Sequence, residues 1–314
     1  MRRPSTRSRP RILCAGIVVL DEVFRVEAFP LPDTKTEASD YVTVGGGCAA
    51  NAAVAIARLG GRASFAGPLG GPAGRDGAGD RILANLAREK VDCGGCVRVP
   101  GARSPVSAII VDAAGRRSIA TYRDLRLTEA PPRQPQKLVA AADGVLIDNR
   151  MPKFARPIGE AARGRGIVTV LDADKPTDAR DPLFAVASHV VFSSECLRAT
   201  AGTNDLAAAI ERMGRLTGGF VAVTDGAGDV LWRDGGRVQR MPAFKIAAVD
   251  TLAAGDVFHG AFTLAVVEGL PIADALRFAA AAAAVKCERF GGSATAPRRA
   301  EVEAFLRQRA RRVT

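Results

Sequence analysis

The chain has 314 residues, of which 47% are hydrophobic and 25% are charged, a composition typical of a globular protein with a large core. Its formal net charge of +11 would suit a nucleic-acid-binding protein, but the arginine-rich ends at 1–11 and 297–314 supply five and four of these charges. The body of the chain is nearly neutral and presents no basic stripe, so we expect no nucleic-acid partner. No apolar run approaches the ~18 residues of a membrane span, so we expect no membrane partner.

The N-terminal segment resembles a signal peptide, because a basic stretch precedes the apolar run "ILCAGIVVL" at 12–20. That run ends in Asp21-Glu22 without a small-residue cleavage site, so we expect a disordered basic tail at 1–10 and a buried first strand at 12–20. Six cysteines are scattered, and only Cys93 and Cys96 form a close pair, without the second pair or two nearby histidines that zinc needs. We expect reduced thiols in a cytoplasmic protein, with metal or redox chemistry at that pair as the alternative.

Short β-branched runs alternate with alanine- and leucine-rich helical patterns along most of the chain, which is typical of βαβ units and a buried parallel sheet. Further strands are expected at 144–148, 166–174, 189–193 and 219–226. Helices are expected at 49–60, 80–90 and 205–216, after Gly255, from Pro271 to Cys287, and near the C-terminus. The pattern predicts one α/β domain at 11–312 that is built on a doubly wound, mostly parallel sheet.

Two segments interrupt this alternation. The residues near 22–44 and 104–124 are patterned like extended hairpins, and the second turns at the sequence "DAAG". They predict a small β-sheet lid over one edge of the domain. Because the edge of such a lid can pair with the edge of another subunit, a homodimer through the lid is also expected.

A glycine-rich motif, "GGGCAANAAVAIARLGG" at 45–61, precedes the first expected helix. Its glycines allow the backbone to approach a bound group, and Asn51 in the first helical turn can bond a hydroxyl. The alternative is a plain turn between strand and helix. The dinucleotide fingerprint, the P-loop and the hydrolase elbow are all absent from the chain.

A second motif, "VDTLAAGDVFHGAF", places Asp256 behind three small residues at a helix start. Backbone N–H groups of Ala253, Ala254, Gly255 and Asp256 can form an anion hole there, and small side chains allow a phosphate to approach. Asp256 can then accept a proton from an attacking hydroxyl. The alternative is an ordinary helix cap, which would not require the crowd of small residues.

In this order, the two motifs resemble the signatures of the ribokinase (PfkB) carbohydrate kinases, and the resemblance extends from about Arg11 to Leu306. It implies a three-layer α/β sandwich with a β lid, ATP as phosphoryl donor, and a sugar or nucleoside hydroxyl as acceptor. Asp256 then corresponds to the catalytic base, and the segment from Ala253 to Gly255 corresponds to the anion hole.

The same resemblance implies binding roles for further residues. Sugar contacts are implied for Asp21, Gly46, Gly47 and Asn51. Nucleotide contacts are implied for Thr224, Gly226, Ala283 and Cys287, and a monovalent cation such as K⁺ for Asp250, Leu252, Cys287 and Gly292. The family's Asn-x-x-Glu motif falls at Ser193 in the sequence "SSEC", where Glu195 is one place out of register, so Mg²⁺ is expected to be held through nucleotide phosphates and water.

Arg150 carries the prediction for the substrate. Ribokinases have a glutamate at the corresponding strand end, whereas a guanidinium favours an anionic substituent. Lys35 in the lid and Thr121 are expected to approach the same place, and the chain looks similar to sulfofructose kinases, which implies an anionic ketose such as 6-deoxy-6-sulfofructose. Alternatives are a keto-deoxy sugar acid, or ribose or fructose if Arg150 is an ordinary surface residue. A nucleoside kinase and a non-catalytic sugar-binding regulator are further alternatives, although the few aromatic residues disfavour the former.

Overall fold

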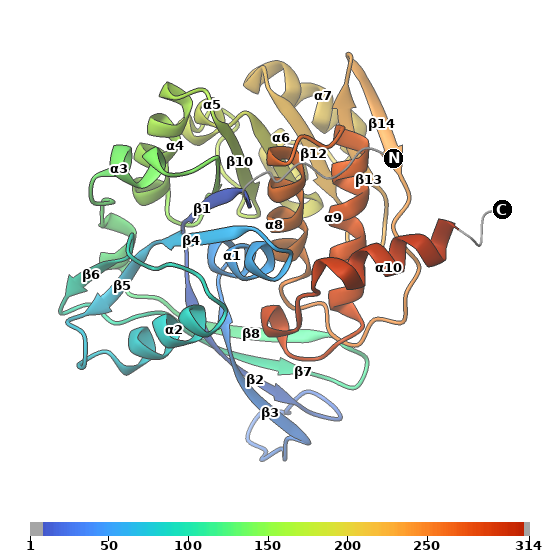
Figure 1. The fold of residues 1–314 in the computed structure, drawn as a ribbon. Helices are drawn as coiled ribbons and strands as arrows, with labels where there is room; N and C mark the ends of the chain where they lie inside the picture. Colours follow the sequence, from blue (N-terminus) through green and yellow to red (C-terminus); the bar gives the residue numbers. More distant parts are fainter. Residues whose placement is uncertain (1–8, 311–314) are drawn as a thin grey trace.

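An eight-stranded sheet forms the centre of the computed structural model, which describes residues 9–310 (Figure 1). Its strand order is β14-β13-β12-β11-β10-β9-β1-β4, in which β13 pairs antiparallel with both β12 and β14 and the other neighbours are parallel. The strands are β1 (Arg11–Ala15), β4 (Arg62–Ala66), β9 (Gly144–Asp148), β10 (Val168–Ala173), β11 (His189–Ser193), β12 (Phe220–Thr224), β13 (Val230–Asp234) and β14 (Arg237–Met241). Most of the expected tail at 1–10 lies outside the described residues.

Helices cover both faces of this sheet, because successive strand residues point to opposite sides. Ile12 and Cys14 of β1 belong to one core, and Leu13 and Ala15 belong to the other. The first core is covered by α1 (Cys48–Arg58), α2 (Gly77–Arg88), α8 (Ala254–Val267), α9 (Ile272–Cys287) and α10 (Arg299–Ala310). The second is covered by α3 (Pro135–Ala140), α4 (Pro152–Gly164), α5 (Pro182–Val186), α6 (Ser194–Ala201) and α7 (Leu206–Thr217). The predicted three-layer α/β fold is confirmed.

A second sheet of four strands, here called the small sheet, lies at the lower end of the molecule in Figure 1. Its order is β3-β2-β7-β8, with β2 (Val19–Arg25), β3 (Asp40–Gly46), β7 (Val106–Val111) and β8 (Arg117–Tyr122). Strands β7 and β8 form an antiparallel hairpin around the "DAAG" turn. A short pair, β5 (Pro68–Gly71) and β6 (Val97–Pro100), and two 3₁₀ turns, η1 (Leu125–Glu129) and η2 (Gly292–Thr295), complete the elements. Closure of the small sheet as a lid, and dimerisation through it, stay predictions.

The expectation of one continuous strand at 12–20 is wrong. The chain leaves the main sheet after Ala15 and enters the small sheet as β2 at Val19. At the crossing, the N–H of Ile17 donates to the side chain of Asp148 (Oδ2, 2.7 Å) at the end of β9 instead of to a backbone carbonyl of a neighbouring strand. Ile17 and Val18 remain buried between the two sheets, so the apolar run continues through the break and hides it from a reading of hydrophobicity. Within residues 9–310, no helix combines the length and apolar character needed to cross a membrane.

Candidate active site

Helix α8 begins at Ala254, so Asp256 occupies its third position. The preceding residue, Ala253, has the left-handed conformation (φ 64°), which is unusual for a residue with a side chain and occurs mainly where surrounding structure enforces it. The N–H of Ala254 already donates to Thr251 O at 3.2 Å, which corrects the expectation that it is open to a ligand. The N–H groups of Gly255 and Asp256 lie in the first turn, where a helix offers no partner.

The space in front of this first turn is open. A Cβ atom added to Gly255 would meet no heavy atom within 4 Å, apart from its own neighbours in the chain and helix. We call residues 251–255 the anion loop, because exposed N–H groups at the start of a long helix favour a negatively charged ligand. The geometry therefore leaves room for an anion beside the carboxylate of Asp256, and the anion site itself stays a prediction.

Asn51 holds the carboxylate of Asp256. Its Nδ2 donates to Asp256 Oδ2 at 2.6 Å, and its side chain is buried in the first turn of α1. Burial raises the pKa of Asp256 to about 6, and the Asn51 hydrogen bond opposes that rise. Asn51 therefore orients the carboxylate of Asp256, and the hydroxyl contact that the sequence predicts for Asn51 stays a prediction.

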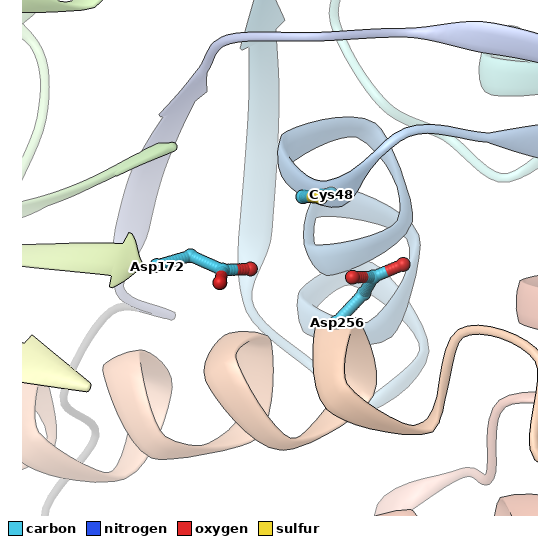
Figure 2. A group of neighbouring side chains, drawn as sticks. All are labelled: Cys48, Asp172 and Asp256. Carbon is cyan, nitrogen blue, oxygen red and sulfur yellow. The ribbon is translucent and has the colours of Figure 1, made fainter. Parts of the chain in front are cut away.

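A second carboxyl group, that of the buried Asp172 at the end of β10, faces the half-buried Asp256, with Cys48 beside them (Figure 2). The ligand atoms of Asp172, Asp256 and Cys48 lie within 4.8 Å of one another. Neither oxygen of Asp172 has a hydrogen-bond partner among the described residues, although the residue is only 1% exposed. Burial, together with the charges of neighbouring aspartates, raises the pKa of Asp172 well above its ordinary value.

The histidine beside Asp172 does not supply a positive charge at neutral pH, although the charge of Arg150 opposes the rise in the pKa of Asp172. His259 Nε2 lies 3.4 Å from Asp172 Oδ1, but burial lowers the pKa of His259 and keeps its ring neutral. Two buried oxygens without partners beside a second carboxylate form the kind of hard donor set that Mg²⁺ prefers. The residues present therefore fit the predicted Mg²⁺, with Asp172 as its carboxylate, whereas Glu195 lies exposed on α6.

Two arginines border the acidic residues. Arg150 follows β9 and forms a fork with Asp174, with distances of 2.8 Å from Nε to Oδ1 and 2.5 Å from Nη2 to Oδ2. Arg123 follows β8 of the small sheet, and its buried Nε has no acceptor among residues 9–310. Burial and the nearby charge of Arg150 lower the pKa of Arg123. The site thus holds one compensated guanidinium and one without an ion-pair partner in the described chain.

The small sheet contributes polar side chains to the same site. Asp21 on β2 is 6% exposed, and its carboxylate lies against Gly46, where an added Cβ would come within 2.0 Å of Oδ2. Burial raises the pKa of Asp21 to about 7, the Ser107 hydroxyl opposes this, and the charge of Asp256 adds to it. Ser107 in turn shares a hydrogen bond of 3.0 Å with Thr121 on β8. Asp21, Gly46 and Thr121, expected as sugar contacts, therefore lie along one polar surface.

Gly47 precedes α1 with a φ of 92°, a conformation that favours glycine, and so turns the chain toward Asn51. Lys35 lies exposed in the loop between β2 and β3, and its approach to Arg150 stays a prediction. The residues expected to bind the nucleotide lie at the carboxyl ends of the parallel strands or on α9: Ser193, Thr224, Gly226, Ala283 and Cys287. The Oγ of Ser193 accepts the N–H of Cys196 at 3.3 Å, so this hydroxyl caps α6.

Several residues that the sequence does not single out lie at the site or beside it. They are Cys48, Ser107, Arg123, Asp148, Asp172, Asp174 and Lys286. The three aspartates have a recognisable signal, since they end or follow the strands β9 and β10, whose carboxyl ends meet at one edge of a parallel sheet. Lys286 also has a signal, because it stands alone within the alanine-rich run of α9.

Comparisons with known proteins agree with this geometry. The family model for pfkB family carbohydrate kinases matches residues 9–299. A ribokinase from Lactococcus lactis is 26% identical in an alignment of 304 residues that covers 95% of this chain and 97% of the relative.

Solved structures give the same answer. A crystal structure from Agrobacterium tumefaciens with a provisional ribokinase name is 36% identical, with a TM-score of 0.92, and covers 97% of this chain and 99% of its own. The structure of a fructokinase from Xylella fastidiosa with bound ATP is 26% identical, with a TM-score of 0.75. The match covers 96% of this chain and 99% of the fructokinase chain. The chain belongs to the pfkB family of carbohydrate kinases.

Proposed function

We propose that this kinase transfers the γ-phosphoryl group of ATP to a hydroxyl of an anionic ketose, of which 6-deoxy-6-sulfofructose is the best match. The observation that carries the kinase chemistry is the half-buried carboxylate of Asp256 beside the open first turn of α8. ATP as donor is supported by the Xylella fastidiosa fructokinase described with bound ATP. The observation that favours an anionic sugar is the guanidinium of Arg123, which has no ion-pair partner in the described chain.

The proposed reaction assigns a role to each part of the site. Asp256 accepts the proton of the attacking hydroxyl, and Asn51 keeps its carboxylate aimed at that hydroxyl. The N–H groups of Gly255 and Asp256 stabilise the charge on the transferred phosphoryl group. Asp172 would hold Mg²⁺, which when bound neutralises charge on the ATP phosphates. Asp21 accepts hydrogen bonds from sugar hydroxyls, and closure of the small sheet excludes water.

The charge balance around the sugar supports an anionic substituent. Asp174 already neutralises the charge of Arg150. The hydrogen bonds between them fix the orientation of the Arg150 guanidinium and leave its remaining N–H groups available. Arg123 adds a positive charge close to it that no residue within 9–310 neutralises through an ion pair. A sulfonate or carboxylate on the sugar would satisfy both guanidiniums through parallel charge-assisted hydrogen bonds.

A neutral sugar is the second candidate. The ion pair between Arg150 and Asp174 favours it, because it leaves only one guanidinium without compensation. The relatives from Lactococcus lactis and Xylella fastidiosa, named a ribokinase and a fructokinase, point the same way. A keto-deoxy sugar acid would fit the anionic proposal equally well.

Replacing Arg150 or Arg123 by Met separates these candidates. We expect each variant to lose ~1.5–3 kcal/mol of transition-state stabilisation for an anionic sugar, the free energy of one charged hydrogen bond, and to retain its kcat/KM for fructose. The matched control is Arg156→Met, because Arg156 is exposed on α4 and pairs only with Glu160 one turn away. The measurement is kcat/KM for sulfofructose, a keto-deoxy sugar acid and fructose. Equal losses on charged and neutral sugars would contradict the anionic pocket.

The raised pKa of Asp256 predicts how the rate depends on pH. Because the base works only when deprotonated, kcat/KM should fall as the pH drops through about 6, the value to which burial raises this pKa. Asn51→Leu removes a hydrogen bond that lowers the pKa, so the acid limb should move to higher pH. Asp21 has a pKa of about 7 and also faces the site, so Asp21→Asn serves as the control that assigns the limb. A profile that stays flat to pH 5 in the parent enzyme would contradict Asp256 as the base.

A further inference from the structure

Lys286 is a lysine without exposed surface, located at the penultimate position of α9. Its ammonium Nζ donates to two oxygens of one residue, Asp250 O at 2.8 Å and Asp250 Oδ2 at 2.9 Å. Lysine is rarely buried to this extent unless its charge is paired, because removing an ammonium from water is costly. Burial lowers the pKa of Lys286 and the charge of Asp250 opposes this, while Lys286 and backbone N–H groups hold the pKa of Asp250 below its ordinary value.

The carboxylate of Asp250 ties the anion loop to two other segments. Its Oδ1 accepts the N–H of Leu252 at 2.7 Å, and its Oδ2 accepts the N–H groups of Gly291 and Gly292 at 3.1 and 3.0 Å. The N–H of Asp250 donates to the carbonyl of Cys287 at 3.1 Å. The end of α9, the start of η2 and the segment entering the anion loop therefore meet at one buried ion pair.

These contacts conflict with the monovalent cation expected at Asp250, Leu252, Cys287 and Gly292. A K⁺ ion binds oxygens, but Leu252 and Gly292 present N–H groups to Asp250. The carbonyl of Cys287 already accepts the N–H groups of Val249 and Asp250, and the carbonyl of Gly292 accepts the Thr295 hydroxyl. The two Asp250 oxygens are occupied by the ammonium of Lys286. These residues do not fit a bound K⁺.

We propose that the Lys286 ammonium acts as a built-in cation that holds the anion loop in its working geometry, so that this kinase needs no monovalent metal ion. The inference rests on the proposed kinase function. It concerns positioning, because Lys286 touches Asp250 rather than a reacting group. Arg117 of β8 donates to Thr251 O at 3.1 Å, so the loop also has a contact with the small sheet in addition to the one with α9.

The test compares two variants that both remove the ammonium. Lys286→Ala leaves space beside Asp250 for an ion, whereas Lys286→Met fills most of that space with an uncharged chain. Activity and melting temperature are measured with and without KCl, with the ionic strength kept constant by tetramethylammonium chloride. In the parent enzyme we expect K⁺ to change kcat by less than ~2-fold, because an ion with no site has no differential affinity to act through. Both variants should lose ~10–100-fold in kcat without K⁺, the cost of a slightly misplaced site.

Added K⁺ should restore much of the activity of Lys286→Ala and raise its melting temperature, and it should do neither for Lys286→Met. Strong activation of the parent enzyme by K⁺, or a Lys286→Ala enzyme that is fully active without K⁺, would overturn the inference. Should Lys286→Ala fail to fold, the response of the parent enzyme to K⁺ still tests the inference, because strong activation by K⁺ would overturn it. Should no sugar be phosphorylated, the proposed function fails, while the melting temperatures still test the cation site because they require no turnover.

Discussion

The Asp256→Asn variant is expected to phosphorylate its sugar ~10²–10⁴-fold more slowly than the parent enzyme, the range for loss of a general base. The amide has nearly the same shape and can still contact Asn51, but it cannot accept the proton of the attacking hydroxyl. Binding of ATP should persist, because the backbone N–H groups of the anion loop are unchanged. The measurement is kcat for ADP release, together with ATP affinity from calorimetry.

The chain offers a closely matched control for this variant. Asp274 occupies the third position of α9, as Asp256 does in α8, but it is exposed to solvent. Asp274→Asn removes the same charge from the same place in a helix and should leave kcat unchanged. Turnover of Asp256→Asn within a few-fold of the parent would return Asp256 to the role of a helix cap.

Gly255→Val is expected to abolish most turnover while leaving the fold intact. Because a Cβ at this position meets no other atom within 4 Å, the valine side chain fits the protein but occupies the space where phosphate oxygens must approach. Removal of one donor of an oxyanion hole costs ~10²–10³ in kcat, and blocking the hole should cost at least as much. The loss should appear in kcat for ADP release and in the affinity for ATP.

The control for this variant is Gly77→Val, at the first position of α2, where an added Cβ is also unobstructed. Both variants place a β-branched residue in the first turn of a helix, so they should share the same small change in the free energy of unfolding, below ~1 kcal/mol. Only Gly255→Val should lose activity. A Gly255→Val enzyme that folds and works normally would show that the anion loop does not bind phosphate.

The sequence predicts the layers of this fold well, because parallel strands and covering helices have different periods of hydrophobicity. It does not predict where the chain changes sheet between Ala15 and Val19, since Ile17 and Val18 are as buried as the strands around them. The contact that fixes the crossing is the bond from the Ile17 N–H to Asp148, a residue more than a hundred positions away. Contacts between residues so far apart in the chain leave no local pattern in the sequence.

At the site, too, features that are local in the sequence can be predicted, whereas contacts between distant segments cannot. Asp256 and the anion loop are visible in the sequence because a helix start, small residues and an acid occur together. The role of Arg123 is not visible, because it depends on how β8 aims the following side chain toward Arg150. Lys286 is conspicuous in its alanine-rich helix, but its partner Asp250 belongs to another segment, so only the structure reveals the ion pair.

The measurement that tests the central claim most directly is ADP release from ATP with each of a set of sugars. We predict sugar-dependent release of ADP, with sulfofructose or a keto-deoxy sugar acid as the best substrate, fructose next and ribose last. Release that no sugar stimulates, or a clear preference for ribose, would contradict this prediction.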